Sequence, residues 1–91
     1  MKQRMMVTFS VDKEISIGVV SEWLNKQIIA TDITEIRMDE RDVELVFCGE
    51  LYTYLGSVVI QSPEAVDCNQ LERVCKHHPH FIHQLEFRTR S

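Results

Sequence analysis

The chain has 91 residues, which is room for one compact domain with a small core and too little for a deep substrate cavity. Its apolar and charged fractions, 44% and 26%, are those of an ordinary globular protein, and a net charge of −4 disfavours nucleic acid as a partner. With no apolar run long enough for a membrane span, no signal-peptide pattern and an odd number of cysteines, we expect a single domain (residues 1–91) with reduced thiols in the cytoplasm.

The first segment predicts a strand followed by a helix. Apolar residues occupy every second position from Met5 to Val11, a period of two that is typical of a half-buried strand. Asp12 is a candidate helix N-cap, and the apolar residues of 15–29 recur at helical spacing. We expect Trp23 of this helix to anchor the core.

The middle of the chain, residues 43–61, has the highest density of β-branched, aromatic and aliphatic residues and should form the centre of a sheet. A strand at 35–38 and a polar turn at 39–42 are expected before it. Gly49 and Gly56 mark its two breaks, because glycine tolerates the backbone angles of turns and bulges. The expected pieces are therefore strands at 43–48, 51–55 and 58–61.

The last third predicts a second helix and a closing strand. Ser62 followed by Pro63 is a good helix start, and Asp67 with Gln70 offers a capping box one turn later. Pro79 should end the helix. Apolar residues then alternate with charged ones over residues 85–90, which indicates the closing strand.

The resulting order, β-α-β-β-(β)-α-β, is that of an α+β two-layer sandwich with an antiparallel sheet and two helices on one face. It resembles the ferredoxin-like superfold, and the extra strand-like piece leaves an elaborated α+β sandwich equally open. We expect one core made of large apolar residues from all of these elements: Val7, Phe9, Val20, Trp23, Leu24, Leu45, Phe47, Leu71, Val74 and Phe87.

A cysteine- and histidine-rich tract near the C-terminus is the densest group of potential metal ligands: Cys68, Cys75, His77, His78, His80 and His83. Its spacing matches no established zinc motif, so we predict a structural tract without metal or cofactor. A nucleophile built from Cys75 and His78 would also need an orienting group and an oxyanion hole, and no catalytic residue is assigned.

The strand phases single out one surface. If Leu45 and Phe47 face the helices, Glu44 faces the other side of the sheet, and if Leu51, Thr53 and Leu55 also point inward, that side has an apolar and aromatic centre: Met6, Val46, Cys48, Tyr52 and Tyr54. Tyrosines within a polar rim are typical of interfaces. We therefore expect a protein-binding module, of the inhibitor, immunity or adaptor type, that uses this face and the acidic segment 31–50 to bind a partner protein or a second copy.

Two other functions remain open from the sequence. One is a small-ligand or metal sensor that uses the cysteine and histidine tract, and the other is a small enzyme with one of those histidines as its general base. A cluster of cations at the sheet edge could hold phosphate or protect the edge from aggregation, and the second role is favoured: Lys2, Arg4, Arg88 and Arg90.

Overall fold

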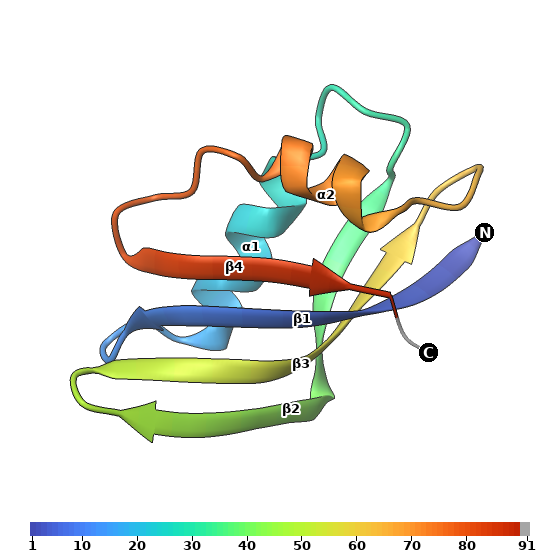
Figure 1. Cartoon of the computed structure of the whole chain (residues 1–91). Coiled ribbons are helices and arrows are strands. Elements are labelled where there is room, and N and C mark those ends of the chain that lie inside the picture. Colours follow the sequence, from blue (N-terminus) through green and yellow to red (C-terminus); the bar gives the residue numbers. More distant parts are fainter. Residues whose placement is uncertain (90–91) are drawn as a thin grey trace.

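The computed structural model describes residues 1–89 and has six elements. They are β1 (Lys2–Asp12), α1 (Ile17–Lys26), β2 (Glu35–Cys48), β3 (Leu51–Gln61), α2 (Cys68–Val74) and β4 (Ile82–Arg88). The strands form one sheet in the order β2-β3-β1-β4, with every neighbouring pair antiparallel (Figure 1). This confirms an α+β fold with a four-stranded antiparallel sheet and two helices.

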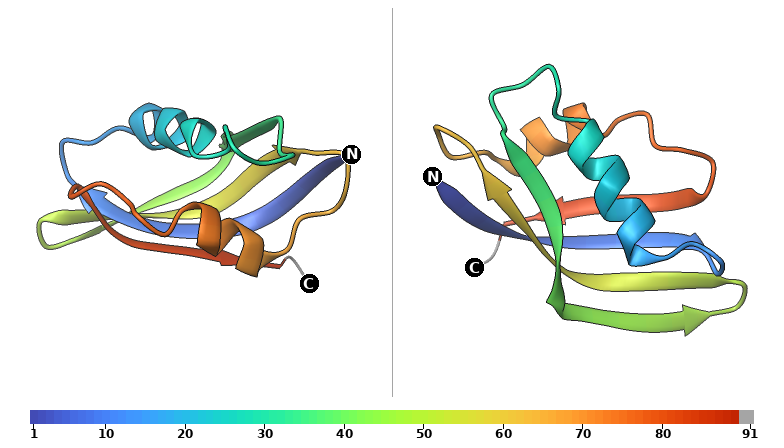
Figure 2. Two further views of the ribbon diagram at one scale, coloured as in Figure 1. Left: turned by 90° about the horizontal axis from the view of Figure 1, so that it is seen from above. Right: turned by 180° about the vertical axis from the view of Figure 1, so that it is seen from behind.

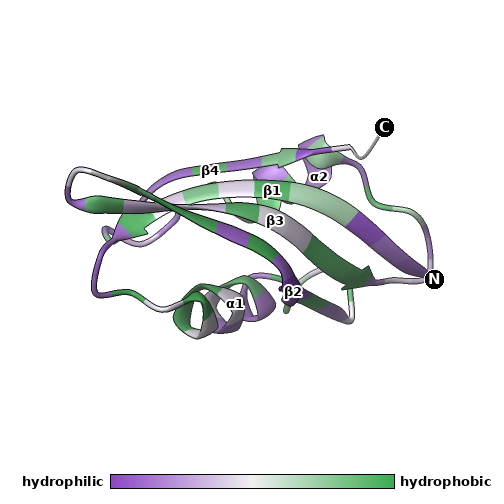
Figure 3. Cartoon of the chain, turned by 90° about the horizontal axis from the view of Figure 1, so that it is seen from below, coloured by the Kyte–Doolittle hydropathy of each residue, from purple (hydrophilic) through white to green (hydrophobic). Residues whose placement is uncertain are grey.

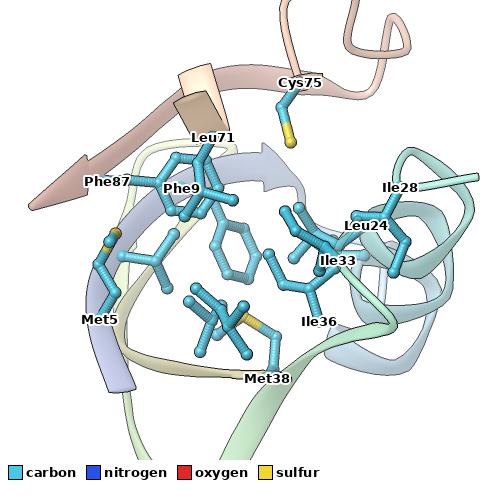
Figure 4. Close-up of a cluster of buried hydrophobic side chains, with 14 of the residues drawn as sticks. Met5, Phe9, Leu24, Ile28, Ile33, Ile36, Met38, Leu71, Cys75 and Phe87 are labelled. Atoms are coloured by element: carbon cyan, nitrogen blue, oxygen red, sulfur yellow. The ribbon is translucent and has the colours of Figure 1, made fainter. Parts of the chain in front are cut away.

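One hydrophobic core joins the sheet to both helices. Val20 and Leu24 of α1 and Leu71 of α2 are fully buried in the same cluster as Phe9 of β1. Figure 4 shows Leu24, Leu71 and Phe9 within this cluster. Seen from behind, α1 runs across the sheet, and the β2–β3 hairpin extends past it (Figure 2). Neither helix in residues 1–89 is long and apolar enough to cross a membrane.

The alternation predicted for β1 is confirmed. Its odd-numbered apolar residues are buried, and each lies opposite a residue of β3 that faces the same way, such as Val58 opposite Met5. Phe9 lies opposite Tyr54, and the two rings stack with centroids 4.8 Å apart. Opposed residues of antiparallel strands share a face, so the pairing register assigns every side chain of the sheet to one side.

Residues 39–42 do not form a turn between two strands, as the sequence suggested. The chain continues through them as the single strand β2, and its pairing with β3 shifts between Met38 and Val43. The extra residues bend the strand, which is what a β-bulge does. The bend is held from the open side of the sheet by polar contacts of Asp39 and Asp42.

Gly56 was expected to break the central stretch, but β3 runs through it without interruption. It pairs with Val43, next to the bend in β2, and a Cβ atom on it would overlap the carbonyl oxygen of Asp42. The glycine therefore admits the bent backbone of β2 rather than a turn. Gly49 does form the expected turn, with a φ of 63° between paired Cys48 and Leu51.

The helix boundaries correct two predictions from the sequence. Asp12 ends β1 instead of capping α1, whose N-cap is Ser16. Ser62 is buried in a loop and begins no helix. Helix α2 begins instead at the second of the two predicted starts, after Asp67, where Asp67 and Gln70 form a complete capping box.

Most of the predicted core is confirmed, while two members are wrong. Leu45 and Phe47 lie on the helix-covered side, as expected. Leu45 is nevertheless 53% exposed and Phe47 63% exposed, because the helices leave this end of the hairpin uncovered. Trp23 and Val74 are half-buried and pack against the core. The parts of β2 and β3 that lie beneath the helices supply four buried core residues instead of Leu45 and Phe47: Ile36, Met38, Val58 and Ile60.

Candidate functional site

Three consecutive apolar residues are exposed on the C-terminal half of β2. Leu45, Val46 and Phe47 have exposed fractions of 53%, 45% and 63%, and we call them the apolar strip. β2 is an edge strand, and within residues 1–89 no strand pairs with its outer side. Figure 3 looks onto this edge, with hydrophobic residues at the hairpin end. A flat edge with apolar side chains on both faces is available for pairing with another chain.

The two tyrosines do not lie on the open face, and that expectation was wrong. The two-residue turn at the hairpin tip places Tyr52 opposite Phe47 and Tyr54 opposite Leu45, so all four side chains are on the helix-covered side. Tyr54 is only 8% exposed. Tyr52 instead supports Phe47, with an edge-to-face ring contact at 5.5 Å. This contact holds the most exposed side chain of the strip in place.

On the open face the structure brings together some of the expected residues. Met6 and Glu44 line a shallow hollow of about 460 Å³ beside the bend in β2. Val46 follows Glu44 by two residues and therefore points to the same face. The side chain of Cys48 lies outside the described part of the structure. Because Tyr52 and Tyr54 lie on the other face, the open face is less apolar than the sequence suggested. Met6, which remains on the open face, is 36% exposed.

Two of the three acidic residues of the bend, Asp39 and Asp42, form polar contacts within the protein. The Arg4 guanidinium lies 2.5 Å from the Asp39 carboxylate, which also accepts the backbone N–H of Arg41 at 3.0 Å. Asp42 accepts a hydrogen bond from the hydroxyl of Ser57. Of the cations expected to cluster at the sheet edge, Arg4 is paired with Asp39. Arg90 lies outside the described residues.

The pKa of Asp39 is lowered, first by its hydrogen bond to Arg4 and then by the Arg41 amide. Such a carboxyl stabilises the fold above its unfolded pKa, near 3.8, and loses that contribution as the pH falls through its lower folded value. Below pH about 4, we expect the free energy of unfolding of Asp39→Asn to fall less steeply with pH than that of the wild type. Urea unfolding at a series of pH values measures the difference. Arg4→Met, which removes the main hydrogen-bond donor to the Asp39 carboxylate, should flatten the pH profile in the same way. An unchanged profile in Asp39→Asn would contradict this assignment.

The cysteine and histidine tract is dispersed by the fold. Within residues 1–89, no three or more histidine, cysteine, aspartate or glutamate side chains gather as a metal site would require. His78 Nδ1 lies 3.1 Å from the carbonyl oxygen of Ile82, and His83 Nε2 lies 2.7 Å from the carboxylate of Asp12. Two of the histidines thus tie the start of β4 to its surroundings.

Cys75 does not have the properties of a nucleophile. It is 4% exposed, and burial raises the pKa of its thiol to about 11. The thiolate is the reactive form, so a raised pKa makes the side chain inert at neutral pH. A small hollow of about 250 Å³ between α2 and β4 is lined by Cys75 and His78, but the burial of the thiol disfavours the pair as a catalytic unit.

A larger hollow of about 510 Å³ lies between the loop before β2 and the loop before α2. The ionisable groups in its lining are Asp32 and Glu64, both on exposed residues. The lining also includes the hydroxyl residues Thr31 and Ser62, but no histidine, lysine or arginine among the lining residues could activate a hydroxyl or bind an anion for acyl or phosphoryl transfer. The hollow therefore supports neither chemistry.

The apolar strip is a run of three consecutive exposed apolar residues on one strand, whereas the other exposed apolar residues of the described part of the chain are scattered. The ring of Phe47, its most exposed member, is supported by Tyr52. No signal in the sequence distinguished the strip from core residues, because its alternation is the same as that of a covered strand.

Comparisons of this chain with protein-family models, curated proteins and solved structures found no match.

Proposed function

We propose that the protein is a small binding module, of the inhibitor or adaptor type, that holds another polypeptide against the β2–β3 hairpin. The observation that carries the proposal is the apolar strip on an edge strand. Leu45, Val46 and Phe47 put apolar groups on both faces of that strand, and together they would be costly to leave in water. A partner that covers them gains this free energy.

The charges around the strip are mainly acidic, with the exposed cation Arg41 among them. Glu40, Glu44 and Glu50 are exposed acidic residues along the outer half of the hairpin. They form a polar rim around an apolar centre, which is the arrangement that steers and orients a protein partner. Asp39 contributes little to this rim, because its carboxylate is nearly buried and paired with Arg4.

Two finer assignments belong to the same proposal. We assign the fold to the ferredoxin-like group, supported by two β-α-β units in which β3 lies between β1 and β2, and β1 lies between β3 and β4.

We place the protein in a reducing compartment such as the cytoplasm, supported by the free thiols of Cys68 and Cys75.

The test is photo-crosslinking from the strip. A benzophenone amino acid at position 47 should crosslink, in the native host, to one defined protein that mass spectrometry identifies. That protein, once purified, should bind the chain, and the double variant V46E/F47S should weaken binding by about tenfold or more because it removes two central apolar contacts.

The matched control is the same benzophenone residue at Gln84, which is exposed on the opposite edge strand, β4. It should give no adduct with that protein. The melting temperature of V46E/F47S should stay close to that of the wild type, since both side chains are exposed. Equal crosslinking from positions 47 and 84, or none from 47, would overturn the proposal.

A further inference from the structure

We propose that the polypeptide bound at the hairpin is a second copy of this chain. The two β2 edges would pair antiparallel about a two-fold axis at Val46 and join two four-stranded sheets into one of eight strands. This inference rests on the proposed function, because it names the occupant of the same apolar strip.

The backbone of β2 is covered in one half and bare in the other. In the N-terminal half, the outward N–H of Met38 donates to the hydroxyl of Ser21 on α1, at 3.2 Å. In the C-terminal half, the hydrogen bonds found in residues 1–89 beyond the β2–β3 ladder include none to residues 43–47. Another extended strand can pair with a row of such groups in place of water.

The side chains of the bare half are complementary to themselves. With the axis at Val46, Leu45 lies opposite the partner's Phe47 on the helix-covered side, and Val46 meets its own copy on the open face. All three residues of the strip then contact apolar groups. A register centred on Glu44 would instead oppose two carboxylates, which destabilises a cross-strand pair.

Charges at the ends of this register are of both signs. Antiparallel pairing about Val46 puts Asp42 opposite the partner's Glu50, where two carboxylates repel each other, and Arg41 level with the partner's Leu51. The Arg41 side chain is 92% exposed and its contact with Asp39 is 3.7 Å long, so the guanidinium is free to turn toward the partner's Glu50. An ion pair there offsets the repulsion from Asp42, and the symmetry forms it twice.

The other edge of the sheet lacks these features. β4 has seven residues, and its exposed positions carry polar side chains, among them His83, Gln84 and Glu86. Short edge strands with charged side chains resist pairing. The fold therefore has one protected edge and one edge available for a copy.

The expected dimer is weak. Three partly exposed apolar side chains on each copy cover an area below the ~1,200 Å² typical of stable complexes. Sedimentation velocity of the full chain should therefore show a monomer–dimer equilibrium that shifts with concentration. Hydrogen exchange of the amides in residues 43–47 should slow as concentration rises, while exchange in β4 should not change.

Charge substitution at the axis identifies the register. V46K alone and V46E alone each oppose like charges across the two-fold axis, and each should weaken dimerisation by about tenfold or more. Mixing equal amounts of the two variants should restore the dimer, because unlike charges then meet. The control pair Q84K and Q84E should dimerise like the wild type, alone or mixed.

The outcomes separate this inference from the proposed function. A wild-type monomer at every concentration, or a mixture of V46K and V46E that does not associate, overturns the dimer. If benzophenone at position 47 then captures a different defined protein that binds in purified form, the proposed function stands. If it captures none, both fail.

Discussion

Replacing Phe9 with alanine is expected to lower the free energy of unfolding by about 3–5 kcal/mol. Phe9 is fully buried and stacks on Tyr54 at the centre of the sheet, so truncation leaves a cavity that β1 and both helices border. Urea denaturation of the wild type and the variant, with equal slopes, measures the difference. The loss is a large part of the stability of a domain of this size.

Two further variants keep this test decisive if Phe9→Ala does not fold. Phe9→Leu retains most of the volume and should cost less, about 1–2 kcal/mol. Phe47→Ala removes the same group from an exposed site and should cost well under 1 kcal/mol, because 63% of that side chain already faces water. Equal losses at positions 9 and 47 would contradict the burial described for both residues.

A single methyl group at Gly56 is expected to destabilise the protein by about 1–3 kcal/mol or more. The Cβ of Gly56→Ala would overlap the carbonyl oxygen of Asp42 and approach Val43 to about 3.0 Å. Backbone atoms cannot move away as a flexible side chain does, so the bend in β2 must shift. The midpoint of chemical denaturation should fall accordingly.

Gly18→Ala is the matched control, with the opposite sign. Gly18 lies in α1, and its added Cβ would meet nothing closer than 3.8 Å. Alanine has the higher helix propensity, so this variant should be more stable by up to ~1 kcal/mol. A stable Gly56→Ala variant would mean that the two strands are farther apart at the bend than described.

The sequence determined the class of fold because local patterns carry that information. The alternation of β1, the helical spacing around Val20 and Leu24, the capping box at Asp67 and the turn at Gly49 each describe residues close together in the chain. Neighbouring residues alone decide these features. The α+β architecture was therefore predictable without coordinates.

The sequence did not determine how the middle of the chain is divided. Residues 39–42 have the composition of a turn, yet they form a bend within β2 because Arg4, far away in sequence, binds Asp39. Gly56 has the character of a break, yet it lies within β3 because the bent backbone of β2 approaches it there. Both outcomes depend on contacts between distant segments.

The sequence likewise predicted one part of the candidate site, and the tertiary structure decided the rest. Its location on the β2–β3 hairpin followed from the apolar character of residues 43–55, which the sequence shows directly. Which side each tyrosine faces depended on pairing through a two-residue turn, and a shift of one residue reverses every side chain. Leu45 and Phe47 have the pattern of core residues, and only the limited reach of two short helices leaves them exposed to a partner.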